Sequence, residues 1–450
     1  SKLPRKNISN LDTSDSNLII QRQIRNQSVS SNSLTLTSQA GLDATVGITS
    51  VFFEPFDVER YSITYQDGSI EPLTSDQVTI SDNSETITFS GLANATASSV
   101  TVGVTLKKVG ASSKSKDYIR SQQLEITRTS GVSTLNGLLT QSSTYGIRVD
   151  DKEISLNVPD VVKILAVYES KTTSTPVLDK VKFVSGLSLN TTAIIGEKIV
   201  GKDSRAIGQI VSAPNATDVN FVYLNGNKFA IGEVVEFEES GIETILQGTE
   251  KGNFIDRTDN YTLDKGHKIQ YCDFSKIIRK AKSAIPSKKL LIIFDKYQVA
   301  SGNTGDFFSV NSYTKERYSK DIPVLRSIGT RVSDLIDFRP RVNPYTVSEG
   351  KSPFAFASRT FESTNPYVVA PRETSILGYS FYLPRIDKLV INQYGEVKLI
   401  KGESAEEPVP PTEAGDSMEI AQITLPPYLY DTANQPDIKM QDNRRFTMRD

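Results

Sequence analysis

The stretch GEKIVGKD, residues 196–203, comes close to a phosphate-binding loop. Gly196, Gly201 and Lys202 have the spacing of the glycine-rich loop whose backbone amides and lysine hold nucleotide phosphates. Asp203 then stands where a serine or threonine should hold Mg²⁺, and its negative charge would oppose the phosphates. The sequence that follows is β-like, so no helix N-terminus points at an anion. We therefore interpret the glycines as turns of a small β structure.

His267 and Cys272 are the single histidine and the single cysteine of the chain, and they lie five positions apart. A zinc site needs about four ligands, so only carboxylates could complete one here. His267 stands in the hydrophilic turn LDKGHKIQ, and no G-x-S-x-G nucleophile motif occurs in the sequence. We expect a surface histidine, and we assign no catalytic, cofactor-binding or metal-binding residue.

The segment SDLIDFRPRV, residues 333–342, places acidic and basic side chains close together around an apolar seam. Asp334 and Asp337 precede Arg339 and Arg341, which predicts a structural ion-pair cluster that locks a loop to the core. A pair of carboxylates for sugar hydrolysis is the alternative. The chain has 53 acidic residues, so such pairs occur anyway and carry little information.

The densest basic run is KIIRKAKSAIPSKK, residues 276–289. Basic residues surround Ile277 and Ile278, as on an amphipathic helix with a solvated face. Asp273 stands at the expected cap of this helix and Pro286 lies just beyond its end. A phosphate or nucleic-acid patch would look similar. The net charge of −2 gives no general attraction to nucleic acid, so we expect none as a partner.

The sequence ends with NRRFTMRD, which holds Arg444, Arg445 and Arg449. Acidic residues lie close by, at ESAEEP and Asp442, and no stacking aromatics are interleaved with the arginines. We interpret these arginines as a junction, and we expect Arg444 or Arg445 to contact an acidic group of the 330–450 region.

The composition indicates a folded, multidomain protein. A chain of 450 residues with 37% hydrophobic and 23% charged residues is long enough for about three domains. One cysteine rules out an internal disulfide. No run of 18 apolar residues exists, and SKLPRKNISN does not read as a signal peptide, so we expect no membrane insertion.

Hydrophobic patterning predicts a mainly β fold in several parts. Residues 1–45 read as an extended arm, and 46–148 as an immunoglobulin-like β-sandwich with a hairpin at Asp82-Asn83-Ser84. Residues 149–176 read as strands that join a third domain.

The second half of the chain continues this pattern. Residues 177–252 contain the echo AIIGEKIVG and FAIGEVVEF with glycine turns, which predicts a small β-barrel that could be an insertion. Residues 253–450 read as a β-rich domain with a few short helices, a buried strand at KKLLIIFDKYQVA and a hairpin at Tyr394-Gly395.

Several phrases resemble a family of virion structural proteins from T-even-like contractile-tailed phages, especially those of marine cyanobacteria. The most specific are GDFFSVNSYTKERYSKDIP, VSDLIDFRPRV, YLPRIDKLVINQYGEVKLIKG and DNRRFTMRD. Earlier phrases that also resemble the family are YSITYQDGSIEPLTSDQVTISDN and EISLNVPDVVKILAVYES, so the similarity spans most of residues 50–450.

The resemblance implies a tail component at the baseplate or at the root of the tail fibres, located in the virion and assembled in the host cytoplasm. It supplies no catalytic residues, and it implies that more chain follows Asp450. The expected partners are other tail or baseplate proteins and further copies of this chain, with a trimer as the guess. We expect a structural protein, not an enzyme and without cofactors. An adhesin that recognises host surface glycan and a tail-borne hydrolase are the alternatives.

Overall fold

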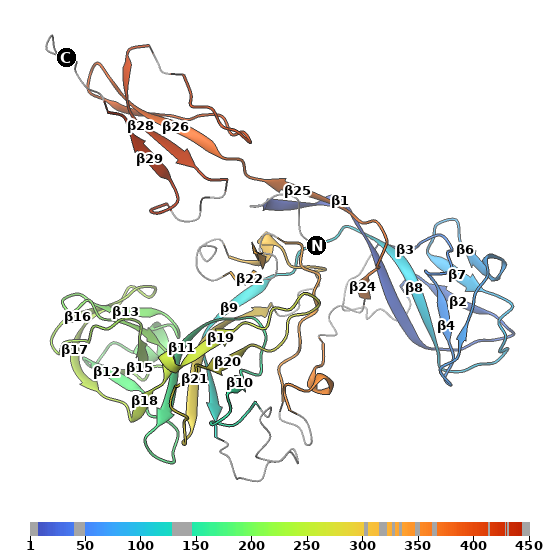
Figure 1. The fold of residues 1–450 in the computed structure, drawn as a ribbon, viewed down its shortest axis with the longest axis horizontal. Coiled ribbons are helices and arrows are strands. Elements are labelled where there is room, and N and C mark those ends of the chain that lie inside the picture. The colour runs from blue at the N-terminus through green and yellow to red at the C-terminus, as the bar shows by residue number, and fades with distance from the viewer. Residues whose placement is uncertain are drawn as a thin grey trace. The chain divides into compact units, whose positions relative to one another are not determined.

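The computed structural model describes residues 8–39, 50–127, 146–300, 305–314, 322–325, 329–332, 335–346, 352–361, 367–412, 415–427, 429 and 432–442. The chain is mainly β and forms several sheets and a closed barrel, which confirms the predicted fold class (Figure 1). It divides into two units. The first is Ser1–Ser115, Ser301–Phe338 and Ser363–Asp450, and the second is Lys116–Ala300 and Arg339–Glu362.

The first unit contains two sheets that share one core. The larger sheet has the order β24 (Tyr367–Val369), β1 (Ile8–Gln27), β8 (Val100–Val109), β4 (Ser62–Thr64) and β5 (Ile70–Glu71), with β25 (Ile376–Phe381) on β1 and β3 (Val51–Phe53) on β8. The smaller sheet has the order β2 (Leu34–Thr37), β7 (Thr86–Phe89) and β6 (Val78–Ile80). Buried side chains of both sheets form one cluster, as in a β-sandwich. The immunoglobulin-like assignment stays a prediction.

The segment that we expected to be an arm contributes a long strand to this sandwich. β1 pairs with β8 from Asn17↔Val109 to Gln27↔Val100. Leu18, Ile20 and Ile24 are buried in the shared core. The Ser- and Asn-rich composition conceals this role because only alternate side chains of a strand need to be apolar. Residues 8–27 are therefore part of the sandwich and not an arm.

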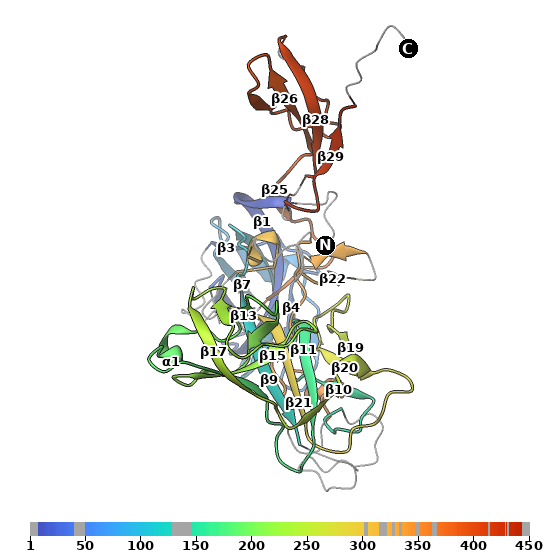
Figure 2. The same ribbon diagram turned by 90° about the vertical axis from the view of Figure 1, so that its left-hand side faces the viewer.

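The C-terminal part of the first unit forms an antiparallel sheet of its own. Its order is β27 (Val397–Ile400), β26 (Arg385–Asn392), β28 (Ser417–Leu425) and β29 (Asp437–Met440). β26 and β27 form the hairpin predicted at Tyr394-Gly395, where Gly395 has a φ of 81°. Both views show these strands as a single layer (Figures 1 and 2). A short pair, β22 (Val324–Leu325) and β23 (Thr330–Arg331), also lies in this unit.

The second unit contains two further sheets. One has the order β18 (Phe254–Asp256), β11 (Val161–Ser170), β21 (Leu290–Val299) and β9 (Lys116–Ile126). The other has the order β10 (Glu153–Ser155), β20 (Lys276–Arg279) and β19 (Tyr261–Asp264). β11 and β21 are the two buried strands that the apolar runs predicted.

The predicted helix in the basic run is wrong, because residues Lys276–Arg279 form the central strand β20. It pairs with β10 on one side and β19 on the other, and Ile277 is fully buried. Two neighbouring isoleucines favour a strand, and pairing on both edges outweighs the helical spacing of the lysines. Asp273 is accordingly not a helix cap.

The closed barrel confirms the barrel predicted for residues 177–252 (Figure 1). Its order is β12 (Asp179–Phe183), β15 (Asp218–Tyr223), β14 (Ile207–Ile210), β13 (Lys198–Gly201), β16 (Val234–Phe237) and β17 (Glu243–Glu250). The α-helix α1 (Leu189–Thr192) follows β12. The described residues also form the 3-10 turns η2 (Ser75–Gln77), η3 (Thr258–Asn260), η4 (Val310–Ser312) and η7 (Phe356–Ser358). Within the described residues, no helix is long and apolar enough to cross a bilayer.

The sequence echo in the barrel is a structural repeat. Glu197 follows Gly196 and accepts hydrogen bonds from the backbone N–H and the hydroxyl of Ser240, both at 3.0 Å. Glu233 follows Gly232 and accepts hydrogen bonds from the backbone N–H and the hydroxyl of Ser204, both at 2.9 Å. Each repeat therefore supplies a buried carboxylate that closes the loop of the other repeat.

Candidate functional site

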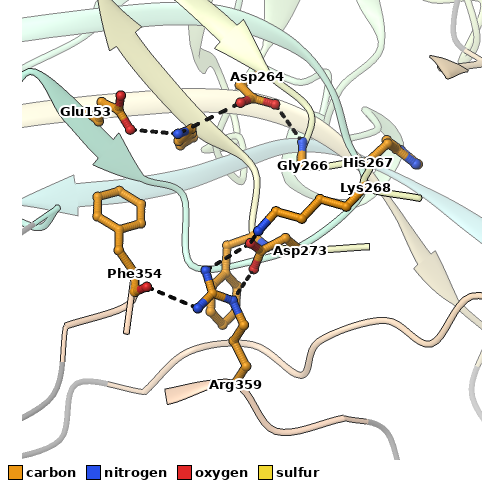
Figure 3. Close-up of a pocket in the computed structure, with 10 residues that line it drawn as sticks. Glu153, Asp264, Gly266, His267, Lys268, Asp273, Phe354 and Arg359 are labelled. Atoms are coloured by element: carbon orange, nitrogen blue, oxygen red, sulfur yellow. Dashed lines mark hydrogen bonds and ion pairs between the residues drawn. The ribbon is translucent and has the colours of Figure 1, made fainter. Parts of the chain in front are cut away.

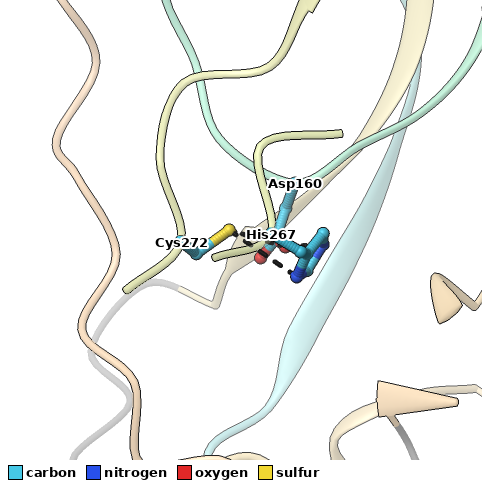
Figure 4. A group of neighbouring side chains, drawn as sticks. All are labelled: Asp160, His267 and Cys272. Atoms are coloured by element: carbon cyan, nitrogen blue, oxygen red, sulfur yellow. Dashed lines mark hydrogen bonds and ion pairs between the residues drawn. The ribbon is translucent and has the colours of Figure 1, made fainter. Parts of the chain in front are cut away.

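The single histidine and the single cysteine lie together with Asp160 in the interior of the second unit (Figure 4). Asp160 directly precedes β11 and has a φ of 57°. His267 and Cys272 lie opposite each other in the loop between β19 and β20. Gly266 sets the entry to this loop. Its φ is 74°, and a Cβ there would lie 2.4 Å from the carbonyl oxygen of Asp273.

The three side chains are in direct contact. His267 Nε2 lies 3.2 Å from Asp160 Oδ1, and Cys272 Sγ lies 3.4 Å from the same oxygen. Cys272 Sγ is also 3.9 Å from His267 Nδ1. The prediction of a surface histidine is wrong, since the side chain of His267 is only 5% exposed. The hydrophilic turn around it gave no indication that the loop closes over a buried carboxylate.

Two cations neutralise Asp160. Arg341 Nε donates to Asp160 Oδ2 at 2.5 Å, and Lys116 Nζ donates to the same oxygen at 2.9 Å. Although burial opposes its ionisation, Arg341 and Lys116 hold the pKa of Asp160 well below its usual value. Burial, helped by the nearby Arg341, lowers the pKa of Lys116 to about 8.

The cysteine and the histidine are held in their neutral forms. Burial, followed by the charge of Asp160, raises the pKa of the Cys272 thiol. Burial lowers the pKa of His267, and Arg339 Nη2 lies 3.3 Å from its Nδ1. A nucleophilic or metal-binding cysteine must be a thiolate, and a nucleophile must be accessible. Because Cys272 is completely buried and favours its thiol form, these properties argue against both roles.

The donor set could in principle hold a metal ion, since one ligand atom of each residue lies within 4.8 Å of the others. The charges oppose it. Asp160 already carries Arg341 and Lys116 on its second oxygen, so a divalent ion would be the third cation on one buried carboxylate. The arrangement fits a closed ion-pair network better than a zinc site.

Of the predicted ion-pair cluster, the structure describes Asp337, Arg339 and Arg341. Arg341 binds Asp160, and Arg339 Nη1 donates to the carbonyl of Lys268 at 2.6 Å. Asp337 is buried and exchanges two backbone hydrogen bonds with Phe308. Asp334 lies outside the described residues, as do the junction residues Arg444, Arg445 and Arg449.

Sequence reasoning missed Asp160 and Lys116, the partners that organise the cluster. Asp160 stands between a proline and a buried strand, and Lys116 stands in a Ser- and Lys-rich stretch. Nothing in either stretch distinguishes these two residues from other surface charges. Only the pairing of β9 with β21 and of β21 with β11 brings them together.

A pocket of about 340 Å³ opens beside His267, and its charges are paired with one another (Figure 3). Lys276 Nζ donates to Glu153 Oε2 at 2.6 Å. Arg359 holds Asp273 through two hydrogen bonds of 2.6 and 2.9 Å, and Lys268 contacts the same carboxylate at 2.6 Å. A hydrolase acid would need a raised pKa. Although burial opposes it, Arg359 and Lys268 lower the pKa of Asp273.

In the segment 196–203, which resembles a phosphate-binding loop, carboxylates of the same chain bind the groups that a phosphate would need. The backbone amides of Asp203 and Ser204, which would have to face a phosphate, donate to Glu233 at 3.2 and 2.9 Å. Lys202 Nζ donates to Glu243 at 2.6 Å. These carboxylates fill the positions of an anion, so the loop is a barrel turn.

The C-terminal sheet presents a different kind of surface. The strand register places nine apolar side chains on one side, which we call the apolar face: Leu389, Ile391, Val397, Leu399, Met418, Ala421, Ile423, Ile438 and Met440. Five of the larger ones, on β27, β28 and β29, are 48% to 70% exposed. Single exposed apolar residues are ordinary, but a contiguous patch marks an interaction site.

On the opposite side of this sheet, the side chains of the two central strands β26 and β28 include a buried charge pair, whereas Lys398 and Lys439 on the outer strands are exposed. Val390 is 2% exposed, and Lys388 pairs there with Glu419 at 2.9 Å. Lys388 and Glu419 are both buried. The sheet therefore buries a charge pair and exposes apolar side chains, the reverse of a half-buried sheet in water.

This sheet lies in the one segment that matches a known family model. Residues 352–449 match a domain of unknown function (DUF4815). No curated protein and no solved structure matches the chain. The match covers a minor part of the sequence, from Phe354 and Arg359 of the pocket through all four strands of the sheet.

Proposed function

We propose that this chain is a structural component of a contractile phage tail, at the baseplate or at the attachment of the tail fibres, and that it acts through protein–protein contacts. The observation that carries the proposal is the apolar face of the C-terminal sheet. A contiguous exposed apolar surface is costly in water, and an assembly subunit removes that cost by burying the surface against a neighbour. The resemblance of residues 50–450 to virion structural proteins is the reason for proposing a phage tail as the assembly.

The polar clusters support the same role. Asp160, Asp273 and Glu233 are each neutralised or hydrogen-bonded by groups of the same unit. A catalytic carboxylate usually has a shifted pKa and keeps at least one oxygen free to interact with the substrate. Here the neighbouring groups neutralise or bind these carboxylates and thereby hold loops and strands in place. A structural protein without disulfides needs such contacts.

Immunogold labelling of phage particles tests this proposal. Antibodies raised against the 450-residue chain would be applied to intact virions and to detached tails. We expect gold at the distal end of the tail in both preparations. Label on the capsid, or no copies of the chain in purified particles by mass spectrometry, would overturn the assignment.

One pocket favours a second candidate function, recognition of host glycan. It has a volume of about 540 Å³ and lies beside the barrel, with Tyr168, Tyr223 and Phe254 among its aromatic residues. The rings of Tyr168 and Phe254 stack at 3.8 Å. The Tyr168 hydroxyl makes no hydrogen bond to the part of the chain that the structure describes. Asp179 and Asp256 also line the pocket, and lysines balance their charge, which suits a neutral sugar.

A glycan array probed with the labelled chain distinguishes this candidate. Binding that is lost in Tyr168→Phe, which removes only the hydroxyl, and kept in Tyr394→Phe would support an adhesin. Tyr394 is a suitable control because it is 80% exposed in a hairpin turn of the other unit. An array without signal would exclude this pocket as a glycan site under the conditions used.

A further inference from the structure

We propose that the apolar face of the C-terminal sheet is covered by the same face of a second copy of this chain. Two such sheets would stack about 10 Å apart as the layers of an intermolecular β-sandwich. The inference deepens the proposed function and rests on it, because it names a second copy of this chain as the partner at this surface. It replaces the trimer guessed from the sequence with a two-fold dimer.

The first argument is the absence of repulsion. A two-fold contact brings the apolar face against the same face of the other copy, so an unpaired charge there would be buried against apolar side chains or, near the axis, against its like. Within the described residues, strand alternation places one charged pair on this side, Arg385 and Asp387, at the start of β26. Their two hydrogen bonds of 2.8 and 2.9 Å neutralise it. The other charges of the sheet, such as Lys388 and Glu419, lie on the opposite side.

The second argument is shape. The sheet is one layer of four strands, and the completing layer must have similar strand lengths and the same twist. An identical sheet meets both conditions without a special partner. The exposed side chains reach from the edge strand β27, with Leu399, to the edge strand β29, with Met440. The contact would therefore extend across the full width of the sheet.

The third argument is size. The patch offers on the order of a few hundred Å² of apolar surface, which is the range of interaction patches on single subunits. A standard interface buries about 800 Å² per partner, and an apolar centre with polar surroundings is its usual composition. The rim residues around the apolar face can supply the remainder.

Light scattering coupled to size-exclusion chromatography tests the inference on the 450-residue chain. We expect a mass of twice 49.6 kDa at micromolar concentration. The variant Met440→Glu should weaken dimerisation at least about tenfold, since each interface would then bury two carboxylates. Met440 is 70% exposed, so the glutamate is compatible with a folded single copy.

Lys439→Glu is the matched control. Lys439 neighbours Met440 on β29 but points to the other side, and its substitution changes the charge by twice as much. We expect its dimerisation to stay within about twofold of the wild type. Circular dichroism and thermal unfolding would confirm that both variants fold.

Three outcomes would overturn the face-to-face contact. These are a concentration-independent monomer, a trimer, which a two-fold contact cannot form, and equal effects of both substitutions. A monomer in solution together with gold label on the tail would leave the proposed function intact and assign the apolar face to a different tail protein. A dimer in solution together with label only on the capsid would leave the face-to-face contact intact and overturn the proposed function.

Discussion

The barrel and the C-terminal sheet differ in how they treat strand edges and apolar side chains. The barrel closes on itself, so its six strands leave no free edge, and Phe221 and Phe237 fill its interior. Within the described residues, the C-terminal sheet stays open, with β27 and β29 at its edges and exposed side chains on its apolar face. The barrel buries its apolar side chains within one chain, whereas the sheet leaves them exposed, as the proposed contact with a second copy requires.

The polar groups show the same contrast. In the barrel and the neighbouring Asp160 cluster, buried carboxylates organise the surrounding loops from within. In the C-terminal sheet, the buried pair Lys388–Glu419 occupies the side where apolar residues would normally lie. The two regions therefore differ in which side of the structure holds the buried charges.

The largest expected effect is the loss of the Asp160 carboxylate. Asp160→Asn would leave Arg341 and Lys116 as buried, uncompensated cations, which should cost about 3–5 kcal/mol of unfolding free energy. Urea unfolding at pH 7 measures this change. Asp259→Asn, at an exposed position, should stay within about 0.5 kcal/mol. Equal stabilities of the two variants would refute the network.

The loop-closing carboxylates of the barrel come next. Glu233→Gln turns one acceptor into a donor opposite the Ser204 N–H, so about 1–3 kcal/mol should be lost. Glu197→Gln should cost a similar amount, because its bonds to Ser240 are equivalent. Glu236→Gln on the exposed side of β16 is the control and should be nearly neutral. Unequal effects at positions 197 and 233 would contradict the structural repeat.

The protonation of His267 should make the free energy of unfolding depend on pH. Burial lowers its pKa in the folded state, so the unfolded chain takes up the proton first as the pH falls through about 6.5. Stability should therefore decrease from pH 7.5 to 5.5, with a slope of at most about 1.4 kcal/mol per pH unit.

His267→Gln should flatten this slope, because the chain has no second histidine. Chemical unfolding at several pH values gives the comparison. An unchanged slope in the variant would show that His267 is not buried as a neutral group.

The smallest effect is expected on the apolar face. Ile438→Thr keeps a β-branched side chain at a position 58% exposed, so the stability of the single copy should change by less than about 0.5 kcal/mol. Val235→Thr, of nearly identical shape, buries a hydroxyl in the barrel and should cost about 1–3 kcal/mol. If both variants lost the same stability at low concentration, the two regions would not differ as described.

The sequence predicted local features better than burial and contacts. The strand β21, the hairpin at Tyr394-Gly395 and the barrel follow from apolar runs and glycine turns, which are local signals. The helix expected in the basic run failed because β10 and β19 decide the conformation of residues 276–279 from a distance.

The candidate site was harder to predict, because burial of His267 depends on Asp160 and Lys116, far away in the sequence. His267 and Cys272, which we did not expect to form a site, are adjacent in space, and their spacing in the sequence gave no sign of the two cations. The apolar face was equally invisible. An alternating strand pattern predicts a sandwiched side, but it does not say which chain provides the second layer.

A cryo-EM map of the intact particle, at a resolution that shows side chains, tests the central claim most directly. The account predicts that the chain lies in the tail and that another protein layer covers Leu399, Met418 and Met440. A map that places the chain in the capsid, or that leaves this face in contact with solvent, would contradict it.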